Sequence, residues 1–184
     1  MRWAALLVVA GLALGACDDG EPESEATLAP TSAPPTSGQP DALERCPQAP
    51  QGSSQSSFDA ASGTYAATVT AVDPAAGSVS FDVLQWLVGP DAVAAFQADN
   101  PGESEGPPND YYIVNANDEV RTAPATAATS VLLVRLATDS NVDLTPGTLD
   151  ELPAYLADTP GGGGLYWLTF DGGQITEICE QYTP

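Results

Sequence analysis

The chain of 184 residues contains no histidine and no lysine, and its basic side chains are four arginines. Twenty-five Asp and Glu residues oppose them, so the formal net charge at pH 7 is −21. Nucleic-acid binding needs clustered Lys and Arg to displace counterions from phosphates. The charge therefore excludes nucleic acid as a partner.

The missing residue types also restrict catalysis. A serine or cysteine nucleophile needs a base, usually His or Lys, and a zinc site needs His or free Cys ligands. Two carboxylates could support glycoside hydrolysis, but so many acidic residues make no single pair informative. The sequence therefore predicts no enzyme and no cofactor, with a carboxylate-based hydrolase as a remote alternative.

The sequence has no apolar run of the roughly 20 residues that a membrane-spanning helix needs. A shorter apolar run, Trp3 to Ala16, follows a positive charge at Arg2, as in the core of a signal peptide. It ends in Leu14-Gly15-Ala16-Cys17, which resembles the lipobox of bacterial lipoprotein precursors. The resemblance implies that the Cys17 thiol receives a diacylglyceryl group and that cleavage makes Cys17 the first mature residue. An ordinary secretory signal that happens to contain a cysteine is the alternative.

The composition changes again after the lipobox. Residues 18–45 are rich in Asp, Glu, Pro, Ser and Thr, and have too few apolar groups to offset the entropy of ordering. We therefore expect a signal peptide over 1–16, a lipidated disordered tether over 17–45 and a β-rich globular domain over 46–184. Two or more acyl chains anchor a protein stably. The expected location is the extracytoplasmic face of the cell membrane, with the lipid anchor as the contact to the membrane.

Cys46 and Cys179 are an even pair at opposite ends of the expected domain. The compartment outside the membrane can be oxidising, so the sequence predicts a disulfide between them. Two free buried thiols are the alternative. A redox-active pair is not expected, because there is no Cys-x-x-Cys spacing.

The pattern beyond Cys46 is mainly that of strands. The expected strands are 65–72, 79–83, 111–115, 131–137, 165–170 and 174–182, with hairpin turns at 73–77 and 171–173. In the segment 131–137, Leu132, Val134 and Leu136 should point inward and Arg135 outward.

Two short helices accompany the strands. One is expected over 92–98, and the second begins near Thr148-x-x-Glu151, a capping-box pattern, or one turn later because of Pro153. The predicted fold class is α+β, mainly β, with about six mostly antiparallel strands in a curved sheet or small, partly closed barrel. The order of a hairpin followed by a helix is compatible with an oligonucleotide/oligosaccharide-binding-like (OB-like) topology.

Two side chains are candidates for contact with a ligand. Tyr112 belongs to a pair of adjacent tyrosines, of which strand alternation exposes one, and an exposed ring can stack against a sugar or a partner protein. Its alternative role is to close the core. Arg121 could bind a carboxylate or phosphate, or could form an internal ion pair with Asp82, Asp110 or Glu180.

Asp139, Asn141 and Asp143 alternate like the opening ligands of a calcium loop. An EF-hand has glycine at its sixth position, where this chain has Leu144, so the segment is not an EF-hand. The three residues are weak candidates for an irregular calcium loop, and a solvated turn is the alternative.

Two further stretches resemble uncharacterised secreted proteins of Gram-positive bacteria, chiefly actinobacteria. They are Asn109-Asp110-Tyr111-Tyr112-Ile113-Val114-Asn115-x-Asn117, followed by Arg121-Thr122, and Leu165-Tyr166-Trp167-Leu168-Thr169 with the terminal Ile178 and Glu180-Gln181-Tyr182. The resemblance covers roughly residues 65–184. It implies a shared domain and carries no activity and no catalytic residue.

Together these features predict a membrane-anchored envelope lipoprotein. Its acidic domain would interact, without catalysis, with an envelope protein or a component of the cell wall. The alternative is a module that binds a small ligand or a cation such as calcium.

Overall fold

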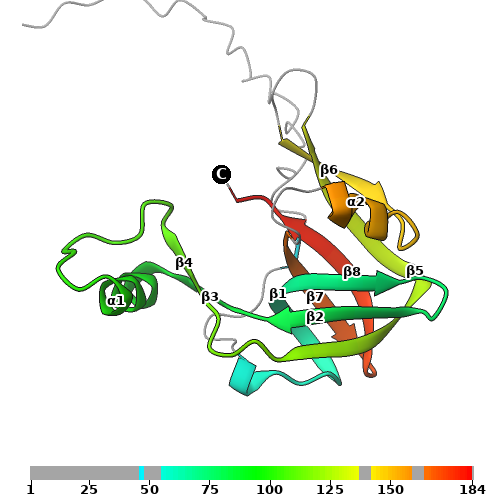
Figure 1. Cartoon of the computed structure of the whole chain (residues 1–184), viewed down its shortest axis with the longest axis horizontal. Coiled ribbons are helices and arrows are strands. Elements are labelled where there is room, and N and C mark those ends of the chain that lie inside the picture. Colours follow the sequence, from blue (N-terminus) through cyan, green and yellow to red (C-terminus); the bar gives the residue numbers. More distant parts are fainter. Residues whose placement is uncertain (1–45, 48–54, 137–141, 159–163, 184) are drawn as a thin grey trace, which may run out of the picture. The chain divides into compact units, whose positions relative to one another are not determined.

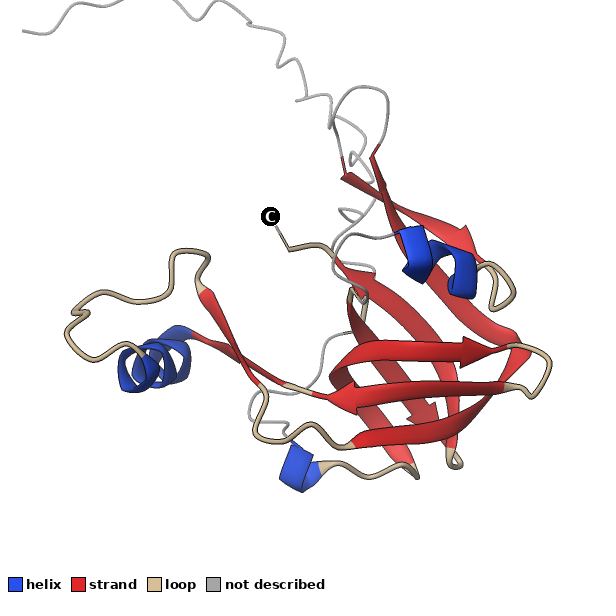
Figure 2. Ribbon diagram, in the orientation of Figure 1, coloured by secondary structure: helices blue, strands red, loops and turns tan. Residues whose placement is uncertain are grey.

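The computed structural model describes residues 46–47, 55–136, 142–158 and 164–183. This part of the chain is mainly β, as the sequence predicted (Figures 1 and 2). Its strands are β1 (Ser62–Asp73), β2 (Ser78–Val83), β3 (Gln85–Val88), β4 (Tyr111–Val114), β5 (Val120–Leu136), β6 (Val142–Gly147), β7 (Leu165–Asp171) and β8 (Gln174–Gln181). Its helices are α1 (Gly89–Asp99) and α2 (Leu152–Asp158).

Five of the strands close into a barrel (Figure 1). They follow the order β2-β1-β7-β8-β5, and β5 pairs back with β2 from Ser78 opposite Pro124 to Asp82 opposite Val120. The pair β5–β8 is parallel, and the other barrel pairs are antiparallel. β6 pairs with the far end of β5 outside the closed ring. The predicted small barrel is thus confirmed, and it is closed rather than partly open.

The connectivity of this barrel is OB-like. Its third and fifth strands along the chain, β5 and β8, form the parallel pair, and α2 lies between the third and fourth strands. OB proteins bind ligands over their second and third strands and with the loops between strands 1–2 and 4–5. Here both of those loops are tight turns. Gly172 and Gly173, with φ of 59° and 84°, supply the two positive φ values of a type I′ turn.

β5 is longer than the sequence predicted. It has 17 residues, whereas the pattern indicated only 131–137. Its first half is rich in Ala and Thr and contains Pro124, which disfavours a strand in sequence-based reasoning. The register against β8 shifts between Ala125 and Ser130. At this irregularity the buried Thr129 hydroxyl accepts from the Thr126 N–H (3.0 Å) and donates to the Ile175 carbonyl (2.9 Å).

The inward face of 131–137 was predicted wrongly. Val131 and Leu133 are buried inside the barrel, at 3% and 0% exposure, and Leu132 and Val134 are partly buried on its outer face. The side chain of Leu136 lies outside the described residues. Arg135 is exposed, as predicted. The inward face could not be predicted from the alternation of apolar and polar residues, because both faces of this part of β5 are apolar. The outer face is apolar too because other segments cover it.

The chain therefore has two apolar cores. The inner core fills the barrel and includes Phe81, Leu133, Tyr166, Leu168 and Ile178. The outer core covers the barrel wall and consists of Cys46, Ala66, Leu84, Leu144, Leu165, Trp167 and Cys179. Strand alternation separates them, because Tyr166 and Leu168 face inward while Leu165 and Trp167 face outward.

A projection that we call the arm, residues 85–114, interrupts the barrel between β2 and β5. It is the antiparallel pair β3–β4 with α1 between the two strands, and Figure 2 shows it beside the barrel. Pro90 in the first turn of α1 suits a helix start. Trp86 of β3 contacts Trp167 edge to face at 5.6 Å and stacks with Tyr111 at 4.2 Å. This aromatic row joins the arm to the outer core.

Replacing Trp167 with phenylalanine should lower the free energy of unfolding by about 1–3 kcal/mol. The indole N–H donates to Gln181 Oε1 at 2.8 Å, and phenylalanine lacks both this donor and part of the ring. Urea denaturation of the two proteins measures the difference. Tyr112→Phe, which removes an exposed hydrogen bond within the arm, should change stability much less. Equal effects of the two substitutions would contradict this role of Trp167.

Candidate functional site

A groove of about 520 Å³ lies where the arm meets the outer wall of the barrel. Its aliphatic walls are Ile113 of the arm, Leu84 at the junction between β2 and the arm, and Val134 and Leu165 of barrel strands. Polar groups complete the lining: Thr68, Glu180, Gln181, Tyr182 and Thr183. The volume and the mixture of apolar walls with few polar groups are typical of sites for small ligands.

Glu180 is the charged residue among those that line the groove. It lies near the end of β8, and its exposed fraction is 8%. β5 and β8 pair as far as Leu132 opposite Cys179, and β5 then continues beside β6. Past this point the N–H of Val134 donates to Glu180 Oε2 at 2.6 Å. The Glu180 carboxylate thus accepts a hydrogen bond from a backbone N–H of β5 that no longer pairs with β8, because the two strands diverge there.

The hydroxyl of Tyr155 on α2 completes this contact. It lies 2.7 Å from Glu180 Oε2 and 2.7 Å from the carbonyl oxygen of Val134, so two acceptors compete for its proton. Burial raises the pKa of Glu180, and the hydrogen bonds from Tyr155 and Val134 and the charge of Arg135 offset only part of that shift. Burial and the neighbouring Glu180 likewise raise the pKa of the Tyr155 hydroxyl, which stays neutral.

Tyr166 of β7 pairs with Glu180 of β8 and belongs to the inner core. Its side chain is fully buried, and its hydroxyl has no hydrogen-bond partner among the described residues. Burial, followed by the charge of Glu180, raises the pKa of this hydroxyl. A Cβ on Gly164 would lie 3.1 Å from Glu180 Oε1 and 3.3 Å from Tyr166 Cε2. Glycine at position 164 therefore lets the backbone pack closely against Oε1 and the Tyr166 ring, where a side chain would be crowded.

The raised pKa of Glu180 has a consequence for stability. The folded chain holds this proton more tightly than the unfolded chain, so stability falls as the pH rises from the unfolded value, near 4.5, towards the folded one. Glutamine cannot titrate, and its amide oxygen can keep both contacts of Oε2. As the pH rises above about 4.5, the wild type should therefore lose stability relative to Glu180→Gln until the folded carboxyl group has also lost its proton. Urea denaturation across this range tests it, with the exposed Glu103→Gln as control. Parallel pH curves for the wild type and Glu180→Gln would refute the prediction.

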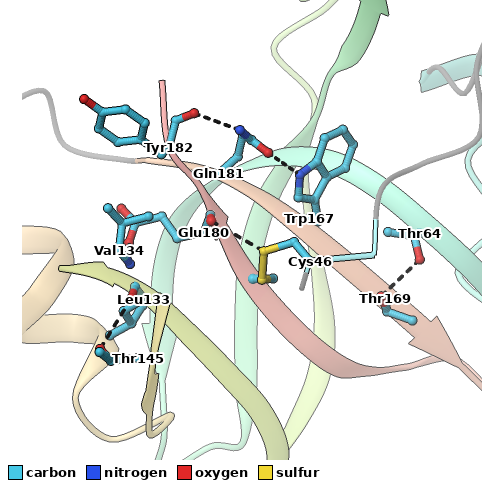
Figure 3. Close-up of a disulfide and its surroundings, with 11 residues drawn as sticks. Cys46, Thr64, Leu133, Val134, Thr145, Trp167, Thr169, Glu180, Gln181 and Tyr182 are labelled. Carbon is cyan, nitrogen blue, oxygen red and sulfur yellow. Dashed lines mark hydrogen bonds between the residues drawn. A yellow bond between two sulfur atoms is a disulfide. The ribbon is translucent and has the colours of Figure 1, made fainter. Parts of the chain in front are cut away.

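The predicted disulfide is confirmed. Cys46 and Cys179 are bonded, with Cα atoms 5.6 Å apart, across a sequence separation of 133 (Figure 3). The bond lies in the outer core beside the groove, and the Cys46 sulfur is 3.6 Å from the carbonyl oxygen of Glu180. Cys17, the predicted lipidation site, lies outside the described residues.

Arg121 and Tyr112 do not line the groove. Arg121 pairs with Glu119 at 2.7 Å and with Asp82 at 3.9 Å, so the internal ion pair with Asp82 is present. Its guanidinium also lies over the ring of Phe58, 5.3 Å from the centroid. A role of Arg121 in ligand binding remains a prediction.

Tyr112 packs within the arm. Its ring meets Phe96 of α1 edge to face at 5.6 Å, and its hydroxyl donates to Asp99 at 3.0 Å, a bond that raises the pKa of the tyrosine. On β4, strand alternation places Tyr112 on the face opposite to that of Ile113, which lines the groove. Its ring therefore packs against α1 within the arm and belongs to neither of the two apolar cores, and ligand contact by Tyr112 remains a prediction.

Of the calcium candidates, Asp139 and Asn141 lie outside the described residues. Asp143 lies in β6, opposite Arg135 of β5. In the described ranges, no group of three or more His, Cys, Asp or Glu side chains is placed to hold a metal ion. Within those same ranges, no helix combines the length and apolar character that crossing a membrane requires.

Comparison with models of known protein families, with curated protein sequences and with solved structures finds no match. The features that bear on function are the groove, the side chains around Glu180 and the charge of the chain.

Proposed function

We propose that this chain is a lipid-anchored binding protein of the bacterial cell envelope. Cys17 would carry the lipid, residues 17–45 would form the tether, and the folded domain would bind a wall component or a segment of an envelope protein. The observation that carries this proposal is the groove between arm and barrel, with its aliphatic walls and one buried carboxylate.

The lining of the groove favours binding over hydrolysis. Glycoside hydrolysis uses two carboxylates on either side of the scissile bond. The described lining includes Glu180 and no second carboxylate, and no basic side chain is among its residues. An anionic ligand would therefore meet repulsion in the groove, and the net charge of −21 would repel it at long range. Neutral or cationic ligands fit the charge of the site.

A side chain that fills the groove should abolish binding. Thr68 lines the groove from the outer face of β1, and Thr68→Trp would occupy part of its volume. The exposed Thr70, on the same strand and outside the groove, offers the matched control Thr70→Trp. The test uses the detergent-solubilised mature chain with soluble fragments from an enzymatic digest of the cell wall. At a hundred times the dissociation constant, a ligand stabilises the folded state by about 2.7 kcal/mol, a rise in Tm of several degrees.

The expected result is a rise in Tm for the wild type and Thr70→Trp and none for Thr68→Trp. A photo-crosslinking residue at Thr183, on the exposed rim of the groove, extends the test to protein partners in intact cells. Cross-links at position 183 that Thr68→Trp removes would support the proposal. It would be refuted if no wall fragment raises the Tm of the wild type and no such cross-link forms, or if Thr68→Trp behaves like Thr70→Trp in both assays.

A further inference from the structure

The end of the groove at Glu180 contains a buried carboxylate without a cation. Both ion pairs in the described part of the chain belong to Arg121. Arg135, whose charge acts on Glu180, donates through Nε to Thr145 at 3.0 Å and lies over the Tyr155 ring at 5.8 Å. Burying a carboxylate is costly unless it is paired and hydrogen-bonded. Glu180 therefore has unused capacity to bind a cation.

That capacity is on one oxygen atom. The hydrogen bonds that Glu180 accepts from described residues both end on Oε2. Oε1 accepts no hydrogen bond from the described residues, and it lies close to the backbone of Gly164, 3.1 Å from the position that a Cβ would take. Since Glu180 lines the groove, Oε1 is the carboxylate oxygen that remains available to a ligand group bound there.

Beside Glu180, the hydroxyl of Tyr166 is a second polar group without a partner among the described residues. It is fully buried, and leaving such a group unsatisfied is energetically costly. Tyr166 Cε2 and Cζ lie 3.3 and 3.4 Å from the same Cβ position at Gly164 that is close to Oε1. Oε1 and the Tyr166 ring thus both pack against the backbone of Gly164.

We propose that this end of the groove binds an aliphatic primary amine, with its ammonium group beside Glu180 Oε1 and its methylene chain along the walls. This inference rests on the proposed function of the groove. The chain has no lysine, so the amine belongs to another molecule. A guanidinium suits the site less well, because its planar fork pairs best with both oxygens of a carboxylate and Oε2 is already occupied.

The probe is pentylamine, with pentan-1-ol as its neutral counterpart of similar length. Binding is followed by the NMR shifts of groove amides in the detergent-solubilised mature chain, at one fixed ionic strength that screens general attraction to the acidic surface. Glu180→Gln removes the charge while its amide oxygen keeps the contacts of Oε2. Glu103→Gln is the matched control, because it removes the same charge from an exposed loop position.

We expect pentylamine to bind at least about tenfold more tightly than pentan-1-ol, the factor that about 1.4 kcal/mol provides. Glu180→Gln should remove this preference, and Glu103→Gln should keep it. Gly164→Ala should weaken amine binding by placing a methyl group in front of Oε1, and it supplies the same test should Glu180→Gln fail to fold.

Equal binding of the amine and the alcohol in the groove would overturn this inference and leave the proposed function standing. The same holds if neither probe shifts the groove amides while Thr68→Trp still abolishes binding of wall fragments. If neither probe shifts them and Thr68→Trp has no effect, both proposals fall. A preference for the amine that survives in Glu180→Gln and in Gly164→Ala would also overturn the inference.

Discussion

Replacing Cys17 with serine should move the protein from the membrane fraction to the soluble fraction. Serine has no thiol to receive the diacylglyceryl group, and without acyl chains the acidic domain has no attraction to an anionic lipid surface. One acyl chain gives only marginal, reversible binding, whereas two or more give a stable anchor. The expected redistribution is therefore nearly complete, and fractionation of cells followed by detection of the protein measures it.

The other two cysteines provide the control. The double variant Cys46→Ala/Cys179→Ala loses thiols but keeps Cys17, so it should stay with the membrane. Retention of Cys17→Ser in the membrane fraction would show that something other than the lipid holds the chain there. This result would refute the anchoring part of the proposed function, and the proposed role of the groove in ligand binding would still stand.

The same double variant should be less stable than the wild type by roughly 2–5 kcal/mol. The disulfide closes a loop with a sequence separation of 133, and the entropy that it removes from the unfolded chain grows with loop length. Alanine keeps the outer core apolar, so the loss reports mainly on the covalent link. Urea denaturation measures it, and substitution is preferable to reduction because Cys179 is fully buried.

Intact mass provides the companion measurement. The oxidised chain should be lighter than its reduced form by two hydrogen atoms, and the double variant should show no such difference. A loss of stability below about 1 kcal/mol in the double variant would contradict the role that loop closure gives to this bond.

Local signals predicted much of the fold. The turn at Gly172-Gly173 could be predicted because two successive positive φ values select glycine. The start of α2 followed from Thr148 and Glu151, and the Thr148 N–H does donate to Glu151 Oε2 at 3.2 Å. Pro153 favoured the later start, and α2 indeed begins at Leu152. Each of these signals acts within a few residues of the chain.

The groove could not be predicted in this way, because its parts meet only in three dimensions. Glu180 is 46 residues from Val134 and 25 from Tyr155, and nothing in its own segment indicates that two strands separate there. The short strands β3 and β6 were missed too, because pairing with β4 and β5 defines them rather than their own pattern. The Ala- and Thr-rich half of β5 is likewise a strand because it pairs with β2, which is distant in the sequence.

The position of the disulfide determines how the domain would carry a mechanical load. A pull on the chain from the N-terminal side enters at Cys46 and crosses the covalent bridge to Cys179 in β8. Glu180, the proposed contact for the ligand, is the next residue along β8. With the tether fixed to the membrane and a ligand held in the groove, tension would pass from one to the other over this short path. Because the bridge bypasses the chain between Cys46 and Cys179, a pull from the N-terminal side would not be transmitted along the backbone into β1 and would not unzip the barrel from its first strand.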